Sequence, residues 1–367
     1  MKNRLATMMA AFSLSAAFAT LAAAAEIPAG YPENYKDLVA AATAEGHLSI
    51  YSTTDAALVQ PLLKDFEAAF PGIAVEYSDL NSTELYNRVI AETASGQGTA
   101  DVAWSSAPDL QIKLASDGYA QEYKSVEAAH LPAWASYKDM VYGTTADPVT
   151  FVYNKRLVPE GDVPATHADL LKLMTGKTAE YDGKIASYDP EKSGVGFYFY
   201  NQDAKNWTDS WALNKAFGKA HIKLYSSAGS MIEKVTSGEH SIAYGIFGSY
   251  GLTKQAKDEN LGVIIPKDYV LVTTRATVIP AEAQDPNAAK LFVDYLLSAR
   301  AQKLIADDIK LYAVRDDVEG ATTLASIKAA AGENVHPIAL DDKLLEGLDE
   351  TTRLAFLNEW QKAMKGE

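Results

Sequence analysis

Hydrophobic residues in the first third of the chain follow two spacings, one typical of helices and one typical of strands. Leu58, Leu62, Phe66 and Phe70 recur at a helical period, and a Pro-Gly turn then leads into a short apolar run. The predicted helices cover residues 35–45, 55–70, 81–95 and a segment that ends at 117–118, and the predicted strands cover 47–51, 73–77 and 100–104. Strands that alternate with helices in this way predict an α/β fold with a parallel sheet.

The pattern changes near the middle of the chain, where a turn lies between two short strand-like runs, 140–142 and 150–153. We expect the chain to cross here into a second domain and to return through the long β-rich run 269–279. Capping-box patterns at Thr166 and Ser230 predict two helix starts between these crossings. The other elements expected beyond the first crossing are strands at 184–187 and 242–247, a helix entered at 193–196, and helices at 286–307 and 341–365.

The first 25 residues carry the pattern of a secretory signal peptide. Lys2 and Arg4 precede an apolar run from Leu5 to Leu21, and three alanines then offer a small-residue cleavage site before Glu26. Serine and threonine interrupt the run, which makes it a poor membrane span. A lipid-anchored protein would need a cysteine at the cleavage point, and the chain has no cysteine. We therefore expect an exported protein, located in a bacterial periplasm.

Length and composition set the number of domains and exclude some partners. A chain of 367 residues usually forms two domains, and 48% hydrophobic residues is ordinary for a globular protein. The net charge of −15, which becomes −17 without Lys2 and Arg4, argues against nucleic acid as a partner. The predicted parts are a signal peptide at 1–25, a first lobe at 26–147 and 276–315, a second lobe at 148–275, and C-terminal helices at 316–367.

Hydroxyl side chains gather where the predicted strands of the first lobe end. They are Ser52, Thr53 and Thr54 after the first strand, Ser105 and Ser106 after the third, and Thr145 at the first crossing. Ligands of open α/β sheets bind outside the carboxyl ends of the strands, and the helices that follow present free backbone N–H groups there. These positions therefore predict an anion-binding crevice. Plain helix capping, which also favours serine and threonine, explains any one of these loops equally well.

The second lobe supplies matching candidates. Its hydroxyl-bearing and glycine positions at element ends are Ser193, Gly194, Ser249 and Tyr250. Arg275 lies within an apolar run, where a cation is costly unless it is paired or faces a cleft. It could bind an anion through two hydrogen bonds or form a structural salt bridge, and both possibilities stay open at this point. Arg315 is a weaker candidate of the same kind.

Signals for enzymatic chemistry are poor. The sequence has no G-x-S-x-G, H-E-x-x-H or Walker motif, and no G-x-G-x-x-G follows a predicted strand. Its six histidines are scattered without the spacing of metal ligands. We therefore expect a protein that is not an enzyme and that holds neither a cofactor nor a metal ion.

A series of short motifs resembles the periplasmic solute-binding proteins of ABC importers, in the branch of ferric-ion and organophosphate-binding proteins. The motifs are Leu48–Tyr51, Phe66–Gly72, Ala100–Trp104, Asp117–Tyr119, Phe151–Asn154, Gly238–Glu239 before Ile242–Tyr244, and Ala288–Leu297. Their order and spacing carry the resemblance over the whole chain after the signal peptide. The resemblance implies a two-lobed type II fold, a hinge of two crossing strands, and solute capture by closure of the lobes.

The chain departs from the ferric members of that branch at the positions of their ligands. The resemblance implies a histidine after the first strand, a glutamate after the third and a Tyr-Tyr pair in the second lobe. This sequence has Thr53–Asp55, Ser105–Ser106 and the single tyrosine of Gly248–Tyr250 there. Ferric iron prefers anionic oxygen ligands, which serine and threonine hydroxyls do not supply. The departure favours a small organic anion, either a carboxylate or a phosphate ester.

The function predicted from the sequence is delivery of a small anionic solute to an ABC permease in the inner membrane by a monomeric periplasmic protein. The alternatives are a ferric-iron-binding protein of an iron importer and a ligand sensor that feeds a membrane sensor kinase. The predicted solute contacts are the hydroxyl, glycine, tyrosine and arginine positions named above.

Overall fold

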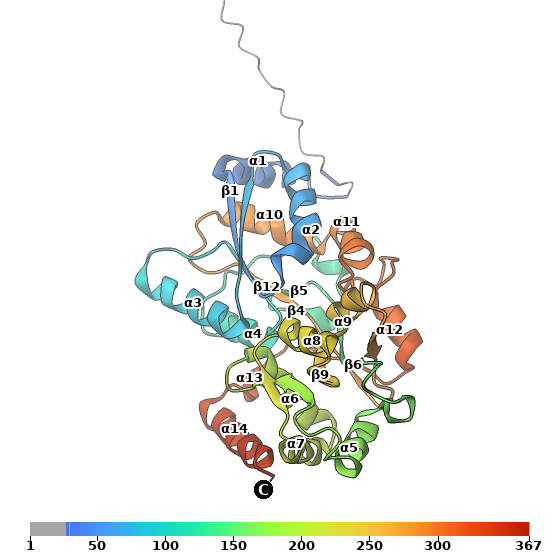
Figure 1. The fold of residues 1–367 in the computed structure, drawn as a ribbon. Coiled ribbons are helices and arrows are strands. Elements are labelled where there is room, and N and C mark those ends of the chain that lie inside the picture. Colours follow the sequence, from blue (N-terminus) through green and yellow to red (C-terminus); the bar gives the residue numbers. More distant parts are fainter. Residues whose placement is uncertain (1–26, 29, 367) are drawn as a thin grey trace, which may run out of the picture.

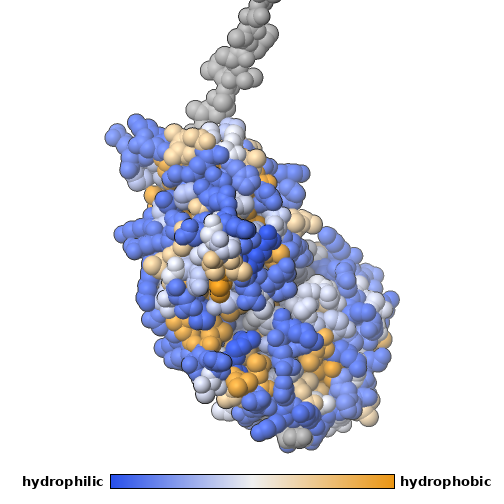
Figure 2. Space-filling model, turned by 90° about the vertical axis from the view of Figure 1, so that its left-hand side faces the viewer, coloured by the Kyte–Doolittle hydropathy of each residue, from blue (hydrophilic) through white to orange (hydrophobic). Residues whose placement is uncertain are grey.

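The structure, a computed structural model, describes residues 27–28 and 30–366, so the predicted signal peptide at 1–25 lies outside the described residues. Two sheets, each packed against helices, form two lobes that lie one above the other (Figure 1). The face shown in Figure 2 is largely hydrophilic, with several patches of hydrophobic residues between the hydrophilic ones. None of the helices in the described part of the chain combines the length and the hydrophobicity needed to cross a bilayer.

The sheet of the first lobe has the strand order β2-β1-β3-β12-β5-β4. Its strands are β1 (His47–Ser52), β2 (Ala74–Asp79), β3 (Val102–Ser105), β4 (Ser136–Tyr137), β5 (Val141–Gly143) and β12 (Ala276–Val278). The strands β1, β2 and β3 are parallel, as the alternating pattern predicts, and β12 returns antiparallel to β3. The helices of this lobe are α1 (Tyr35–Glu45), α2 (Ala56–Ala69), α3 (Ser82–Ser95), α4 (Pro108–Ser116), α10 (Pro286–Leu297) and α11 (Ala299–Leu304).

The sheet of the second lobe has the order β13-β11-β6-β9-β7-β8, and β10 pairs with β6. Its strands are β6 (Asp147–Asn154), β7 (Ile185–Tyr188), β8 (Lys223–Tyr225), β9 (Ile242–Phe247), β10 (Leu261–Ile264), β11 (Val270–Thr273) and β13 (Val335–Pro337). The helices are α5 (His167–Gly176), α6 (Gly194–Asn206), α7 (Ser210–Lys219), α8 (Ala228–Ser237), α9 (Gly248–Gln255), α12 (Leu324–Ala331), α13 (Lys343–Glu346) and α14 (Glu350–Met364). Short helical turns cover 128–130, 133–135, 160–162 and 305–309.

Two segments that cross between the sheets form a hinge. The backbone N–H of Thr144 donates to the carbonyl of Arg275 at 2.9 Å, and the Trp104 Nε1–H donates to the Thr144 hydroxyl at 2.8 Å. Glycine at position 143 leaves room for a hinge side chain, because a Cβ there would lie 2.6 Å from Oγ1 of Thr274. The predicted β-rich run 269–279 is therefore two strands, β11 and β12, and the hinge residues Thr274 and Arg275 lie between them.

The structure corrects two of the predicted elements. Helix α8 begins at Ala228, and its N-cap is Ser227 rather than Ser230, because the Ser227 hydroxyl accepts the backbone N–H of Ser230. The segment 316–367, predicted as helices alone, also contributes β13 to the second sheet, where it pairs with β11. A three-residue strand carries too little periodicity to be found from sequence, and only its sheet partner stabilises it.

Each lobe has its own apolar core, and a further cluster joins them. Phe66, Trp104 and Phe292 are fully buried in the first lobe, and Phe151 and Phe217 are fully buried in the second. A third cluster contains side chains from both lobes, including those of α4 and α6. The lobes therefore face each other at close range around the hinge.

Candidate functional site

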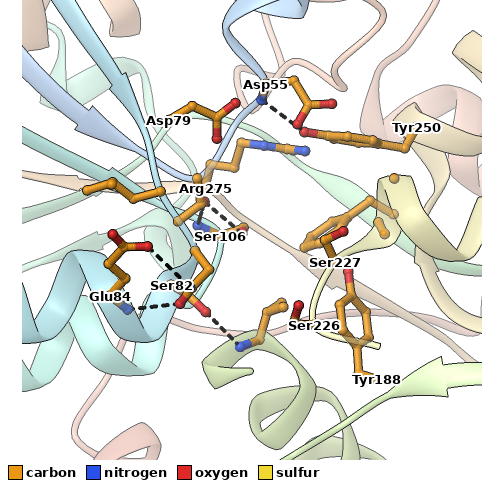
Figure 3. A pocket seen from close by; sticks show the side chains of 17 residues that line it. Asp55, Asp79, Ser82, Glu84, Ser106, Tyr188, Ser226, Ser227, Tyr250 and Arg275 are labelled. Carbon is orange, nitrogen blue, oxygen red and sulfur yellow. Dashed lines mark hydrogen bonds between the residues drawn. The ribbon is translucent and has the colours of Figure 1, made fainter. Parts of the chain in front are cut away.

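A cavity of about 240 Å³ lies between the two lobes, directly in front of the hinge (Figure 3). Both lobes contribute to its wall. Its lining residues are Thr53, Asp55, Asp79, Leu80, Asn81, Ser82, Glu84 and Ser106 from the first lobe, and Tyr188, Val195, Ser226, Ser227, Ala228, Gly229, Phe247, Tyr250 and Arg275 from the second lobe and the hinge. A solute of this size would touch both lobes at once, which is the requirement for capture by closure.

The wall of the cavity is built largely from the beginnings of helices. α2, α3 and α4 of the first lobe, and α6, α8 and α9 of the second, each contribute a residue in or beside the first turn. The first four N–H groups of a helix have no partner within the helix, and the helix dipole is positive at this end. In the first turn of α8, Ala228 and Gly229 line the cavity. Residues at the starts of six helices therefore line the cavity, whereas the first N–H groups of α6 and α9 already donate to side chains of the protein.

Hydroxyl groups of the first lobe form one side of the cavity. The hydroxyls of Thr53 and Ser106 lie 2.8 Å apart, and Thr53 Oγ1 also accepts the backbone N–H of Ser106 at 2.8 Å. This pair joins the ends of β1 and β3, as the rule for carboxyl ends of parallel strands predicts. Both side chains remain on the cavity wall, where they can donate to or accept from a solute.

Arg275 reaches the cavity from the hinge but is already paired within the protein. Its side chain is 1% exposed, and its guanidinium forms a buried ion pair with Asp147 at 2.7 Å. Its Nε–H donates to the Thr54 hydroxyl at 3.0 Å. The guanidinium carbon lies 5.0 Å from the ring centre of Phe247 and 5.6 Å from that of Tyr250. Of the two roles left open by the sequence, the structural salt bridge is thus present, and the edge of Arg275 also lines the cavity.

Direct hydrogen bonds connect the lobes beside the cavity. The backbone N–H groups of Gly194 and Val195, at the start of α6, donate to the hydroxyls of Thr83 and Ser82 at 3.1 and 3.2 Å. A Cβ on Gly194 would lie 2.7 Å from Cδ1 of Leu110 in the first lobe. These contacts show a structure in which the lobes are closed against each other.

Three carboxylates also line the cavity, and the sequence interpretation did not include them. Asp55 and Asp79 lie at one end of the cavity, above the Arg275 guanidinium, and Glu84 lies lower on the first-lobe side (Figure 3). Burial raises the pKa of Asp79, and the negative charge of Asp55 raises it further. Burial also raises the pKa of Asp55, against the effect of nearby Arg275. The two aspartates therefore share one electrostatic environment.

The predicted contact residues separate into two groups. Thr53, Ser106, Tyr250 and Arg275 line the cavity. The others are held by the protein itself: Ser52 and Ser105 accept nearby backbone N–H groups, Thr54 and Thr145 accept from Arg275, Ser193 caps α6, Gly194 donates to Thr83, and Ser249 donates to Asp147. The predicted candidate Arg315 lies outside this cavity and is paired with Glu127 and Asp317 at 2.5 and 2.6 Å.

A sequence signal existed for some of the missed residues. Asp79 ends β2, so the rule applied to β1 and β3 also points to it. Asn81 and Glu84 were visible as the capping pattern of α3. Ser226 and Ser227 follow β8, a three-residue strand that the periodicity did not reveal.

Within the described residues, a grouping of histidine and carboxylate ligand atoms within reach of one metal ion occurs at His47, Asp101 and Asp285. His47 begins β1, whereas the cavity lies at the other end of that strand. Two tyrosines, Tyr188 and Tyr250, line the cavity, and burial raises the pKa of both.

Comparison with known proteins identifies the family. The family model described as bacterial extracellular solute-binding protein matches residues 61–332. Among curated proteins, no sequence matches this chain. The substrate-binding protein of an ABC transporter from Agrobacterium tumefaciens is 35% identical, with a TM-score of 0.83 over 87% of this chain and 94% of that one.

Two further solved structures share the fold at lower identity. Apo ferric ion-binding protein A from Pasteurella haemolytica is 20% identical, with a TM-score of 0.68 over 88% of this chain and 99% of that one. The periplasmic binding protein AfuA from Actinobacillus pleuropneumoniae, solved with fructose-6-phosphate bound, is 18% identical, with a TM-score of 0.69 over 87% and 98%. The two-lobed type II fold expected from the sequence is confirmed, and this chain belongs to the bacterial extracellular solute-binding protein family, whose members bind solutes and are not enzymes.

Proposed function

We propose that this protein is the solute-binding component of an ABC importer, and that its solute is a small organic anion, either a carboxylate or a phosphate ester. The family match and the 35% identical ABC transporter protein from Agrobacterium tumefaciens support the transport role. The solute class rests on one observation, the convergence of six helix N-termini on a cavity of about 240 Å³. An anionic group beside the first turn of α8, where Ala228 and Gly229 line the cavity, would interact favourably with the dipole of that helix.

Closure of the lobes couples binding to recognition by the permease. A solute shifts the open-to-closed equilibrium only by the contacts that it gains in the closed state. In this protein Ser106 of the first lobe and Ser227 of the second would supply such contacts, since both residues line the cavity. The hinge strands and the hydrogen bonds between α3 and α6 are the elements that such closure uses.

Ferric iron is the second candidate, because ferric ion-binding proteins share this fold. The cavity offers Asp55, Asp79 and Tyr250 as oxygen ligands. Hydroxyl groups such as those of Thr53 and Ser106 line the first-lobe side of the cavity, and ferric iron does not favour neutral hydroxyls as ligands. The organic anion is therefore the better supported proposal.

A thermal-shift screen of the purified protein tests the proposal. The panel contains sugar phosphates, short phosphonates, organic acids and ferric salts. A true solute at about a hundred times its Kd adds about 2.7 kcal/mol of stability, which raises Tm by roughly 5 °C. Ser227→Ala on the cavity wall is expected to reduce the shift caused by the solute, and Ser237→Ala at the far end of α8 is the matched control.

Two results of this screen would contradict the proposal. Stabilisation by ferric salts alone, with a tyrosinate-to-iron absorption band, would replace the organic anion by iron as the solute. A solute-induced shift that is identical in Ser227→Ala and in the unmodified protein would place the site elsewhere.

A further inference from the structure

A segment near the C-terminus connects the two lobes on a path separate from the hinge. β13 pairs with β11 of the second sheet, and α14 packs on α7 of the same lobe. The residues between β13 and α14 pass along the first lobe, where α13 packs against α4 (Figure 1). The chain thus leaves the second lobe, contacts the first and returns. We call residues 338–347, which make this excursion, the strap.

Hydrogen bonds and an ion pair attach the strap to the first lobe. The backbone N–H of Leu340 donates to the carbonyl of Trp134 at 2.8 Å. The Asp342 carboxylate accepts the Tyr137 hydroxyl and forms an ion pair with Lys138 at 3.3 Å. These three partners lie in or beside β4, so the strap is attached to the edge of the first sheet.

Lys205 in α6 attaches the same segment to the second lobe. Its ammonium group donates to the carbonyl of Lys343 at 3.3 Å and forms an ion pair with Glu346 at 3.6 Å. The strap also passes close to α6 at Gly347, where a Cβ would lie 3.0 Å from Oδ1 of Asn201. The strap is therefore held by both lobes at once.

Apolar side chains of the strap are buried between the lobes. Ile338, Leu340 and Leu344 are 8%, 4% and 5% exposed, and they belong to the apolar cluster that also contains side chains of α4 and α6. Burial of such side chains is the main favourable term when protein surfaces associate. All three lie outside the cavity lining, so their contacts need no solute.

We propose that the strap holds part of the solute-free population in the closed arrangement. Because the strap is bound to both lobes, opening must break its contacts with one of them. A closed population that exists before binding reduces the free energy that the solute has to supply, and it raises the apparent affinity in proportion. The inference goes beyond the proposed function, since it does not depend on which solute the cavity takes.

Distances between two spin labels test the inference on protein that has been dialysed and refolded to remove bound solute. The chain has no cysteine, so Lys64→Cys in α2 and Lys172→Cys in α5 place one label on an exposed position of each lobe. Double electron–electron resonance then gives the ratio of closed to open molecules. We expect Asp342→Lys to lower this ratio about threefold, the scale of an exposed ion pair. Leu344→Ala should lower it about tenfold or more, since it removes a buried side chain.

Two further variants separate the strap contact from a change in net charge or in folding. Glu350→Lys reverses an exposed charge in the first turn of α14 and should leave the ratio unchanged. Lys138→Asp combined with Asp342→Lys reverses the ion pair and should restore part of the closed population. If Leu344→Ala does not fold, the ion-pair variants decide the test, because both of their positions are exposed.

Three results would overturn the inference. The first is a distance distribution of the unmodified protein without a closed population, and the second is a ratio that stays the same in Asp342→Lys and Leu344→Ala. The third is a larger closed population in Asp342→Lys, which would mean that the strap keeps the lobes apart. Because no solute is added, these results leave the organic-anion proposal to the thermal-shift screen.

Discussion

At the scale of single residues, Arg275 and Asp147 define the chemistry of the hinge. Arg275 is 1% exposed and Asp147 is fully buried, and the two form an ion pair at 2.7 Å. The backbone N–H of Ser249 also donates to Asp147 at 3.0 Å. Removing one member of such a pair leaves an uncompensated buried charge, which costs more than the pair itself contributes.

We therefore predict that Arg275→Ala lowers the free energy of unfolding by about 3 to 5 kcal/mol in the absence of any solute. Urea unfolding followed by circular dichroism measures it. The double variant Arg275→Ala with Asp147→Ala should recover a large part of the loss, because it removes the unpaired carboxylate as well. Equal stability of Arg275→Ala and the unmodified protein would mean that this arginine serves the solute and not the hinge.

At the scale of elements, the contact between α3 and α6 determines how closely the lobes approach. The α6 N-terminus donates to the hydroxyls of Ser82 and Thr83, and a Cβ at Gly194 would lie 2.7 Å from Cδ1 of Leu110, so the Leu110 side chain would have to shift. The backbone at Gly194 does not have a positive φ, so alanine is compatible with the helix itself. The requirement for glycine therefore belongs to the closed arrangement and not to the folding of α6.

Gly194→Ala should consequently weaken solute binding by about tenfold or more while leaving Tm without solute nearly unchanged, because the added methyl overlaps Leu110 only when the lobes close. Calorimetry measures the affinity, and small-angle X-ray scattering measures the compaction on binding. Gly176→Ala is the matched control, since Gly176 also lies in a helix of the second lobe and its Cβ would meet nothing within 4 Å, but it does not line the cavity. Normal affinity and normal compaction in Gly194→Ala would contradict this role of the α3–α6 contact.

At the scale of the whole molecule, two buried carboxylates make stability depend on pH. Burial raises the pKa of Asp109, in α4 between the lobes, to about 7, and raises the pKa of Asp294, in α10, to about 6. A carboxyl whose pKa is higher in the folded state than in the unfolded state binds its proton more tightly when folded. The stability that this tighter proton binding adds to the folded state is therefore present at low pH. It is lost as the pH rises from about 4, the pKa of the unfolded chain, through the pKa of the folded state.

We predict that the unmodified protein is more stable at pH 5.5 than at pH 8, and that Asp109→Asn reduces this difference by about 2 kcal/mol. Asparagine keeps the oxygen that accepts the backbone N–H of Leu110, so the variant removes the titration and preserves the hydrogen bond. Urea unfolding at the two pH values checks the difference. A pH dependence that is the same in both proteins would show that Asp109 ionises normally in the folded state.

Much of the fold followed from the sequence because local patterns carry it. The helices that end at Gly46 and Gly96, the Asn81 and Thr166 caps, and the parallel strands β1 and β3 all lie where periodicity and capping predict. The short strands β8 and β13 were missed, since three residues have no period and depend on a sheet partner far away in the chain.

The sequence by itself determined the α/β architecture, the family, and the ends of β1 and β3 as one wall of a cavity, and it leads us to expect export to the periplasm. Tertiary structure alone decided which hydroxyls line that cavity and which ones instead accept hydrogen bonds from helix N-termini or from Arg275. It also brought Asp55 and Asp79, 24 positions apart, beside the helix N-termini of the other lobe. The physical reason is that the type of a residue fixes which hydrogen bonds its side chain can donate or accept. The fold decides which neighbouring groups the side chain actually bonds to.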